Sequence, residues 1–220
     1  MKKVVVFGNG QMAEIVHVYL THDSRYEVAA FCVNRENLRG ESYRGLPVVS
    51  FEDVTSIYPP SEFSMFIQIS AKQMNRLRAE KYSQAKDKGY ELITYINSKA
   101  IIGPETSIGE NCFIQEHNVI QSFAKIGNDV ILWAGNHIGH HSTVMDHCFV
   151  TSHVVVCGRV TVKPYCYLGV NSTIRDGITV AERCVIGAGA LVMRDTKENQ
   201  VYVGLPAKLS AIASDSVEII

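Results

Sequence analysis

The sequence predicts an α/β, Rossmann-like domain over residues 1–97, then a left-handed parallel β-helix over residues 98–200 and a C-terminal cap or tail over 201–220. Two observations predict this organisation. Short apolar runs alternate with helical patterns in the first half, whereas aliphatic residues recur at every sixth position in the second half. The pattern changes near Asn97.

The first half alternates predicted strands with predicted helices. The apolar runs that predict buried strands lie at residues 3–7, 28–33, 47–49, 65–69 and 91–95. Helical patterns lie between them at residues 11–20, 52–58 and 72–88. This alternation is typical of a parallel sheet with helices on both faces.

In the second half, aliphatic residues keep a spacing of six without interruption, at Ile102, Ile108, Ile114, Ile120, Ile126, Leu132, Ile138, Val144, Val150, Val156, Val162, Leu168, Ile174, Val180, Ile186 and Val192. Neither an α-helix nor a free amphipathic strand has this period. A hexapeptide repeat does, and three hexads form one triangular coil of a β-helix. The aliphatic side chains are expected to stack inside the prism. From Val201 the chain is expected to leave it.

Three cysteines, Cys148, Cys166 and Cys184, are 18 residues apart and are therefore expected to stack in one column. Metal or redox chemistry is one interpretation. Small buried residues at the coil corners explain the spacing without further assumption and are favoured. The six cysteines contain no CxxC pair, which is typical of reduced cytoplasmic thiols.

The composition excludes several classes of protein. The 21 Lys and Arg residues are balanced by 22 Asp and Glu residues, which argues against a nucleic-acid partner. The apolar run in MKKVVVFGNG is too short for a signal peptide, and no run of 18 apolar residues predicts a membrane span. A cytoplasmic protein is predicted.

A glycine turn, Gly8-Asn9-Gly10-Gln11-Met12, follows the first strand and begins the first helix, a context that suits phosphate binding. The second strand ends near Asn34 without the acidic residue that would hold a ribose, so a dinucleotide-dependent dehydrogenase is disfavoured. A sugar-nucleotide pocket fits better, with Gly8 to Met12 near the phosphates and Asn34 near the ribose or base. A turn kept only for helix–strand packing remains an alternative.

Four segments carry a family resemblance: FGNGQMAEIV, NHIGHHSTVMDHC, YLGVNSTIRDGITV and VIGAGALVMRD with the later VYVGLPAK. The chain resembles, over essentially its whole length, the hexapeptide-repeat sugar O- and N-acetyltransferases of the sialic-acid O-acetyltransferase-like family, which include the bacillosamine and perosamine N-acetyltransferases. The resemblance implies a homotrimer with active sites between neighbouring prisms. It also implies acetyl-CoA bound along the prism and a nucleotide-linked sugar substrate, as in bacterial surface-polysaccharide synthesis.

The resemblance also implies roles for individual residues. His140 would be the general base, and the backbone N–H of Gly158 would stabilise the oxyanion. Lys208 would approach the 3′-phosphate or adenine end of CoA. The other cofactor contacts that it implies are Asn171, Ala188 and Pro206.

The residue after the predicted base departs from several relatives, which carry an acid where this chain has His141. Either Asp146 orients His140, or His141 contributes in its own right. His153 is a further catalytic candidate. For His137 and His147 an exterior or trimer-interface position without chemistry is favoured, although imidazole suits proton transfer at neutral pH.

Other functions remain open. His117 and His153 are two coils apart, like two zinc ligands of γ-type carbonic anhydrases, but the third ligand position holds Gly158, and no metal is predicted. A transferase with a small non-sugar acceptor and a non-catalytic solenoid that binds a sugar nucleotide are the remaining alternatives. The sequence does not distinguish an amino from a hydroxyl acceptor.

Overall fold

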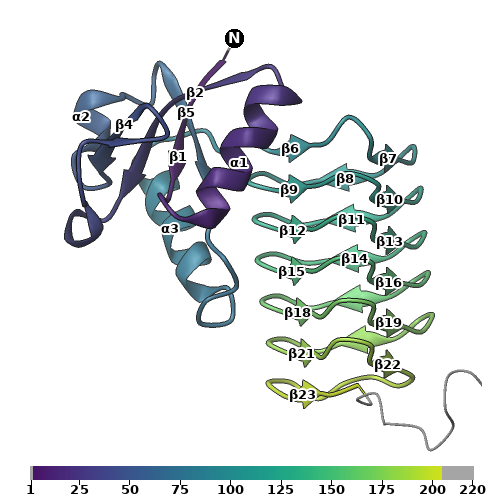
Figure 1. Ribbon diagram of the computed structural model, residues 1–220. Helices are drawn as coiled ribbons and strands as arrows, with labels where there is room; N and C mark the ends of the chain where they lie inside the picture. The colour runs from purple at the N-terminus through teal and green to yellow at the C-terminus, as the bar shows by residue number, and fades with distance from the viewer. Residues whose placement is uncertain (1, 205–220) are drawn as a thin grey trace, which may run out of the picture.

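The computed structural model describes residues 2–204, which form an N-terminal α/β domain beside a triangular prism of stacked coils (Figure 1). The predicted fold class, an α/β domain followed by a left-handed β-helix, is confirmed. No helix among these residues is both long enough and apolar enough to cross a bilayer.

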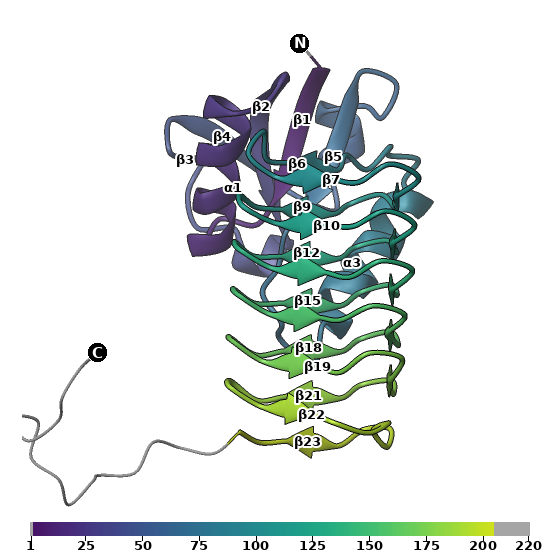
Figure 2. The ribbon, with the colours of Figure 1, turned by 90° about the vertical axis from the view of Figure 1, so that its right-hand side faces the viewer.

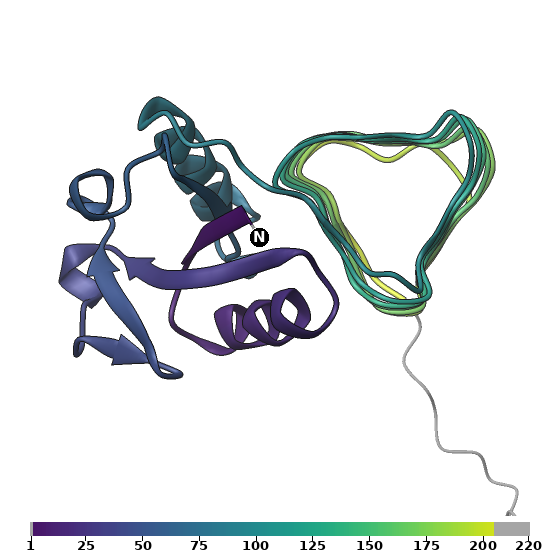
Figure 3. The ribbon, with the colours of Figure 1, turned by 90° about the horizontal axis from the view of Figure 1, so that it is seen from above.

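The N-terminal sheet has the order β3-β4-β2-β1-β5, and all its pairings are parallel except that of β3 with β4. Its strands are β1 (Lys2–Phe7), β2 (Tyr26–Val33), β3 (Ser42–Tyr43), β4 (Leu46–Ser50) and β5 (Phe63–Ile67). Side chains alternate across β1, so that Val4 and Val6 pack under one face, and Val5 and Phe7 under the other. Helices α1 (Gln11–His22) and α3 (Arg76–Asp87) cover opposite faces (Figure 3), and α2 (Val54–Ile57) is a single turn.

Two sequence predictions for this domain need correction. The helix predicted from residue 72 begins only at Arg76, because Gln73, Met74 and Asn75 all have left-handed backbone conformations. The strand predicted at 91–95 is reduced to one bridge between Leu92 and Met65, and its last residue, Tyr95, begins the first strand of the prism instead.

The prism is built from two-residue strands that pair in parallel with the strand three hexads later. The strands are β6 (Tyr95–Ile96), β7 (Ile101–Ile102), β8 (Ser107–Ile108), β9 (Phe113–Ile114), β10 (Val119–Ile120), β11 (Lys125–Ile126), β12 (Ile131–Leu132), β13 (His137–Ile138), β14 (Thr143–Val144), β15 (Phe149–Val150), β16 (Val155–Val156), β17 (Thr161–Val162), β18 (Tyr167–Leu168), β19 (Thr173–Ile174), β20 (Thr179–Val180), β21 (Val185–Ile186), β22 (Leu191–Val192) and β23 (Val201–Tyr202). They form three flat sheets around a triangular core, seen end-on in Figure 3 and from the side in Figure 2.

The corners of the prism explain much of its unusual composition. Between consecutive strands one residue takes the left-handed conformation, at Glu105, Asn111, His117, Phe123, Asp129, His141, His147, His153, Arg159, Tyr165, Asn171 and Arg183. Asn, Asp and His are enriched in this conformation relative to other residues that have a Cβ atom. Four of the eight histidines therefore have a backbone reason for their positions. His140 has no such backbone reason for its position, because the left-handed residue of its corner is the next one, His141.

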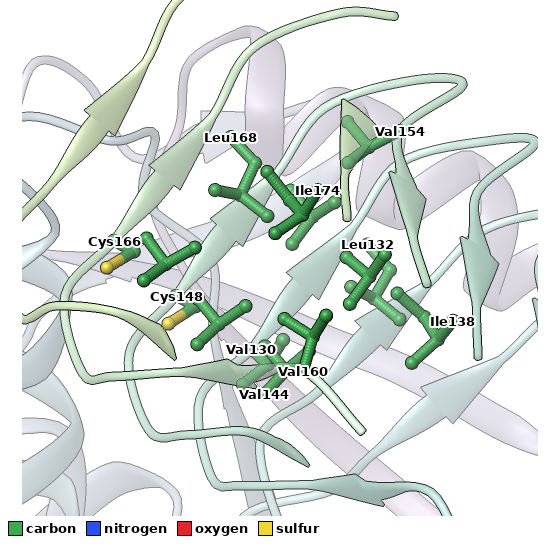
Figure 4. Close-up of a cluster of buried hydrophobic side chains, with 14 of the residues drawn as sticks. Val130, Leu132, Ile138, Val144, Cys148, Val154, Val160, Cys166, Leu168 and Ile174 are labelled. Atoms are coloured by element: carbon green, nitrogen blue, oxygen red, sulfur yellow. The ribbon is translucent and has the colours of Figure 1, made fainter. Parts of the chain in front are cut away.

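The prism core contains the predicted aliphatic residues from Ile114 to Val192, which come from all three sheets, together with buried corner residues. Figure 4 shows part of this core, with Leu132, Ile138 and Val144 among its labelled side chains. Cys148, Cys166 and Cys184 are fully buried in this core, as the spacing predicted. Burial raises the pKa of the nearby Cys112 thiol to about 12, so this thiol stays protonated.

The two ends of the prism lie beyond the predicted boundaries. Strand β6 already pairs with β9, so the first strand of the prism lies before residue 98. The prediction that the chain leaves the prism at Val201 is wrong for β23, which pairs in parallel with β21. The spacing of six is lost after Val192, but the chain still returns to the same sheet edge and finds the backbone partners there.

Arg78 joins the N-terminal domain to the prism. Its side chain is fully buried, and its Nε donates to Asp129 Oδ1 at 3.0 Å. Its terminal nitrogens donate to the backbone oxygens of Asp129, His147, Cys148 and Ile69 and to Asn75 Oδ1. Asp129 in turn accepts from Asn111 and faces His147 Nδ1 at 2.8 Å. The guanidinium thus holds α3 against one corner of the prism.

The Arg78→Met variant is expected to lose about 3–5 kcal/mol of unfolding free energy, because it leaves a buried carboxylate and several carbonyls without their donor. Urea unfolding measures this loss. Arg76→Met, at an exposed position of the same helix, is the matched control and is expected to change stability by about 0.5 kcal/mol or less. Equal stabilities of the two variants would contradict the proposed role of Arg78.

Candidate active site

A pocket of about 580 Å³ opens at the carboxyl ends of β1, β2 and β5. All six residues predicted to bind substrate line it: Gly8, Asn9, Gly10, Gln11, Met12 and Asn34. The sheet order places β1 between β2 and β5, so the pocket lies where the strand order reverses. Ligands of open α/β sheets bind at such switch points.

The glycine turn shapes the floor of this pocket. Gly8 has a φ of +121°, which residues with a side chain rarely adopt, and its N–H donates to Cys32 O at 2.8 Å. Gly10 is the N-cap of α1, so the unpaired N–H groups of the first helical turn face the pocket wall. A helix N-terminus in this position favours phosphate.

Sequence reasoning missed several lining residues, including Arg39, Lys72, Lys81 and Gln68. The lining found among residues 2–204 has three cationic side chains and no Asp or Glu. Lys81 is mostly buried, donates to Gln84 Oε1 at 2.8 Å and lies over the Phe51 ring at 5.3 Å. The pocket therefore has the charge that a diphosphate requires.

His140 lies on a corner of the prism, two residues after the end of β13. It is exposed, and its backbone N–H donates to Gln121 Oε1 at 2.9 Å. Its ring lies against Gly158 of the next coil: a Cβ atom placed on Gly158 would come within 2.8 Å of both Nε2 and Cε1. Only glycine leaves room for the imidazole there. The backbone N–H of Gly158 has no hydrogen-bond acceptor in the described part of the chain.

His141 contacts His140 directly. The two Nδ1 atoms are 3.2 Å apart, and the His141 ring stacks on Phe123 with centroids 4.7 Å apart. An Nδ1–Nδ1 hydrogen bond needs one ring to donate and the other to accept. When His140 donates, its Nε2 keeps a lone pair and faces Gly158.

Asp146 and His153 do not reach His140 within one chain. Asp146 lies six residues later, at the next corner, where its Oδ1 accepts from the backbone N–H of Asn128 at 2.7 Å. His153 lies at the third corner, with its ring against Gly135. Three hexads complete one coil, so His141, His147 and His153, which are six residues apart, occupy three different corners.

The predicted cofactor residues lie at two corners. Gly158 shares the corner of His140, whereas Asn171 and Ala188 lie at the corner of His153, across the sheet that contains β13 and β16. Pro206 and Lys208 lie outside the described residues.

Asp176 was missed by sequence reasoning. It lies one coil beyond Gly158, and its Oδ1 would be 3.1 Å from a Cβ atom on that glycine. Arg159 pairs with it at 3.5 Å. The spacing of 18 residues from Gly158 was the signal that could have found it.

The remaining histidines lie elsewhere. His147 belongs to the Arg78–Asp129 cluster and stacks on Tyr165, with centroids 4.9 Å apart. His137 lies between Val119 and Val155 on the outside of one sheet. Within residues 2–204, no three or more His, Cys, Asp or Glu side chains are grouped so that they could hold a metal ion.

Comparisons with known proteins agree with this architecture. Residues 165–194 match the family model described as the hexapeptide repeat of succinyl-transferase. A UDP-3-O-acylglucosamine N-acyltransferase from Herminiimonas arsenicoxydans is 33% identical over 107 residues, which cover 47% of this chain. The match spans only 29% of the length of that curated relative.

Solved structures match over much more of the chain. Perosamine N-acetyltransferase from Caulobacter crescentus, solved with CoA and GDP-perosamine, is 26% identical with a TM-score of 0.81 and covers 96% of this chain and 97% of its own. The acetyltransferase domain of PglB from Neisseria gonorrhoeae, solved with acetyl coenzyme A, is 20% identical with a TM-score of 0.80. The match covers 94% of this chain and 98% of that domain, and at this identity it supports the fold alone. The predicted resemblance to the hexapeptide-repeat sugar acetyltransferases is therefore confirmed, and it extends over nearly all of the chain.

Proposed function

We propose that this protein transfers the acetyl group of acetyl-CoA to an amino or hydroxyl group of a nucleotide-linked sugar. The observation that carries the proposal is the contact between His140 and Gly158, where a base and an unpaired backbone N–H meet at one exposed corner. The nearly full-length similarity to an enzyme solved with CoA and GDP-perosamine supports both substrates. The similarity to N-acyltransferases favours an amino acceptor.

The chemistry follows from these two groups. His140 Nε2 removes the proton from the acceptor as its nitrogen or oxygen attacks the thioester carbonyl. The Gly158 N–H stabilises the negative charge that develops on the carbonyl oxygen. When the C–S bond breaks, the imidazolium of His140 returns the proton to the departing CoA sulfur.

His141 acts as a positioning residue in this scheme. Its stacked ring accepts from His140 Nδ1 and so keeps the lone pair of His140 on Nε2. The His141→Phe variant is expected to lower kcat about tenfold with little change in KM, because the ring still packs but no longer accepts a hydrogen bond. His141→Asp, which restores an acceptor, is expected to retain more activity. Steady-state kinetics of the two variants check this, and equal losses would contradict a hydrogen-bonding role.

The arrangement within one chain supports a homotrimer. Helix α3 contacts one corner of the prism through Arg78, and α1 contacts a second corner, where Tyr19 donates to Glu116 Oε2 at 2.6 Å. Burial, together with this carboxylate, raises the pKa of Tyr19 to about 12, so the phenol remains a donor. The third corner of the prism points away from the N-terminal domain (Figure 3). His140 lies at this corner, because it follows β13 and contacts neither of the other two corners. A neighbouring chain would supply the sugar-nucleotide pocket.

The outer face of the sheet beside this corner has the chemistry of an interface. Ile101 and Leu191 are each 64% exposed on it, and Val119 and Val155 lie between them. His137 and Thr173 lie on the same face. Packing against another copy would bury its apolar side chains. Acetyl-CoA would then lie along the face between Gly158 and the corner of Asn171 and Ala188. A cytoplasmic role in surface-polysaccharide synthesis completes the proposal.

Acetyl-CoA-dependent thiol release, measured with UDP-, GDP- and dTDP-linked amino and deoxy sugars, tests the proposed function. Turnover of one of these compounds is the expected result. A protein that binds acetyl-CoA but acetylates none of them would have a non-nucleotide acceptor. A protein that does not bind acetyl-CoA would not be an acetyltransferase.

A further inference from the structure

Gln68 has a buried amide without a protein partner. It directly follows β5, is only 2% exposed and lines the pocket beside the glycine turn. Neither its Nε2 nor its Oε1 is hydrogen-bonded to any described residue. Each unpaired group of a buried amide costs about 1–3 kcal/mol, so this side chain is unfavourable unless something else pairs with it.

The neighbouring buried amide is paired on both sides. Asn111 accepts from the N–H of Ile67 at 2.9 Å and donates to the oxygen of Ile67 at 3.0 Å. Asn111 therefore satisfies the end of β5 one residue before Gln68. The contrast indicates that the amide of Gln68 is not needed to satisfy the backbone there.

The position of Gln68 within the pocket identifies the part of the ligand that it can reach. A Cβ atom placed on Gly8 would lie 3.6 Å from the backbone oxygen of Gln68, so the two segments are adjacent. Asn34, whose Oδ1 is also unpaired, follows β2 on the other side of β1. In folds of this type the nucleoside lies toward the end of the second strand and the phosphates at the first helix. The group attached beyond the phosphates then lies on the β5 side.

The chemistry of the amide agrees with this placement. Phosphate oxygens only accept hydrogen bonds here, so a phosphate could pair with Nε2 but would leave Oε1 unsatisfied. A sugar hydroxyl both donates and accepts, so neighbouring hydroxyls of one ring can satisfy both atoms.

We propose that the amide of Gln68 hydrogen-bonds hydroxyl groups of the sugar moiety of the bound sugar nucleotide, and so contributes to the choice of sugar. This inference rests on the proposed function and adds a specificity-determining residue to it. Arg39 and Lys72 also line the pocket. As cations they would hold the diphosphate without distinguishing one sugar from another.

Calorimetry tests the inference by comparing how tightly the wild type and the Gln68→Leu variant bind a sugar nucleotide and its parent diphosphate. The pairs are UDP with UDP-N-acetylglucosamine, GDP with GDP-mannose, and dTDP with dTDP-glucose. For the pair that the wild type binds, the variant is expected to bind the sugar nucleotide about tenfold more weakly and the parent diphosphate within about twofold of wild type. Gln115→Leu, at a buried glutamine of the prism outside the pocket, is the matched control.

Thermal unfolding of the same variant distinguishes ligand recognition from a structural role. Leucine removes an unpaired buried amide, so the Tm of the free protein is expected to stay the same or rise. A Tm several degrees lower would mean that the amide has a protein partner, and would overturn the inference.

The other binding outcomes are equally decisive. Equal weakening of the sugar nucleotide and its parent diphosphate would assign Gln68 to the base or phosphates instead. Unchanged binding in Gln68→Leu, with acetyl transfer intact, would overturn the inference and leave the proposed function standing. A wild type that binds none of the probes would overturn both.

Discussion

Replacing His140 with alanine is expected to lower kcat/KM for acetyl transfer by about 10²–10⁴-fold, the usual contribution of a general base. The side chain is exposed at a prism corner, so its removal leaves the core unchanged. The affinities for acetyl-CoA and for the sugar nucleotide are therefore expected to stay near those of the wild type. Steady-state kinetics with calorimetric binding of both ligands give the comparison.

The matched control is His22→Ala, which removes another exposed imidazole at the end of α1. It is expected to keep wild-type activity. A His140→Ala enzyme with more than a tenth of wild-type activity would remove the imidazole from the proton transfer. Such high residual activity of His140→Ala is expected if the acceptor is an amine that reaches the site already deprotonated.

The Gly10→Asp variant is expected to weaken sugar-nucleotide binding by at least about 100-fold while the protein stays fully folded, because a carboxylate at the helix N-terminus opposes the diphosphate. Gly10 has an ordinary extended conformation, and a Cβ atom there would meet nothing within 4 Å. Aspartate is also a better N-cap than glycine, so the Tm is expected to stay the same or rise. Calorimetry and thermal unfolding measure the two effects.

Gly10→Asn is the control, because it has nearly the same shape and capping ability without the charge. Its affinity is expected to lie much closer to that of the wild type. If both variants bind equally weakly, the loss comes from size and not from charge, and the diphosphate does not lie at the start of α1.

The Gly10→Asp variant also tests whether the active site is shared between chains. Gly10→Asp and His140→Ala are each expected to be nearly inactive alone. Unfolded together at equal concentration and refolded, they are expected to recover about a quarter of wild-type activity, since random trimers place an intact pocket beside an intact base at that frequency. No recovery would contradict a site built from two chains.

The contact between His140 and Gly158 agrees with their spacing of 18 residues, although the sequence analysis paired them only through the family resemblance. Positions 18 apart meet in neighbouring coils, and this follows from a strict period of six without knowledge of the docked domain. The glycine turn was equally predictable, because its strand, turn and helix are contiguous. The spacing did not predict the end of the prism, because β23 pairs with β21 after the period of six is lost.

Residues whose partners are distant in sequence could not be found in this way. Arg78 is one of several cationic residues in a polar helix, and only the docking of α3 on the prism reveals that it is fully buried. Gln68 shows no signal in the sequence until β5 and the glycine turn are placed side by side. The histidine-rich segment was misleading in the opposite direction, because His141, His147 and His153 separate to three different corners.

The sequence by itself determined the two halves of the chain, the triangular coil, the glycine turn and the proximity of His140 to Gly158. Each depends on contacts within one supersecondary unit or between adjacent coils, and such contacts repeat with a period that the sequence displays. Only the tertiary structure decided which corner of the prism faces the N-terminal domain. It also decided which histidines lie at the contact with that domain and which point away from it. Those outcomes depend on how the two domains dock. The docking buries outward-facing prism side chains, Phe113, Ile131 and Phe149, in a core of the N-terminal domain, and it buries Arg78, which has no periodic signature.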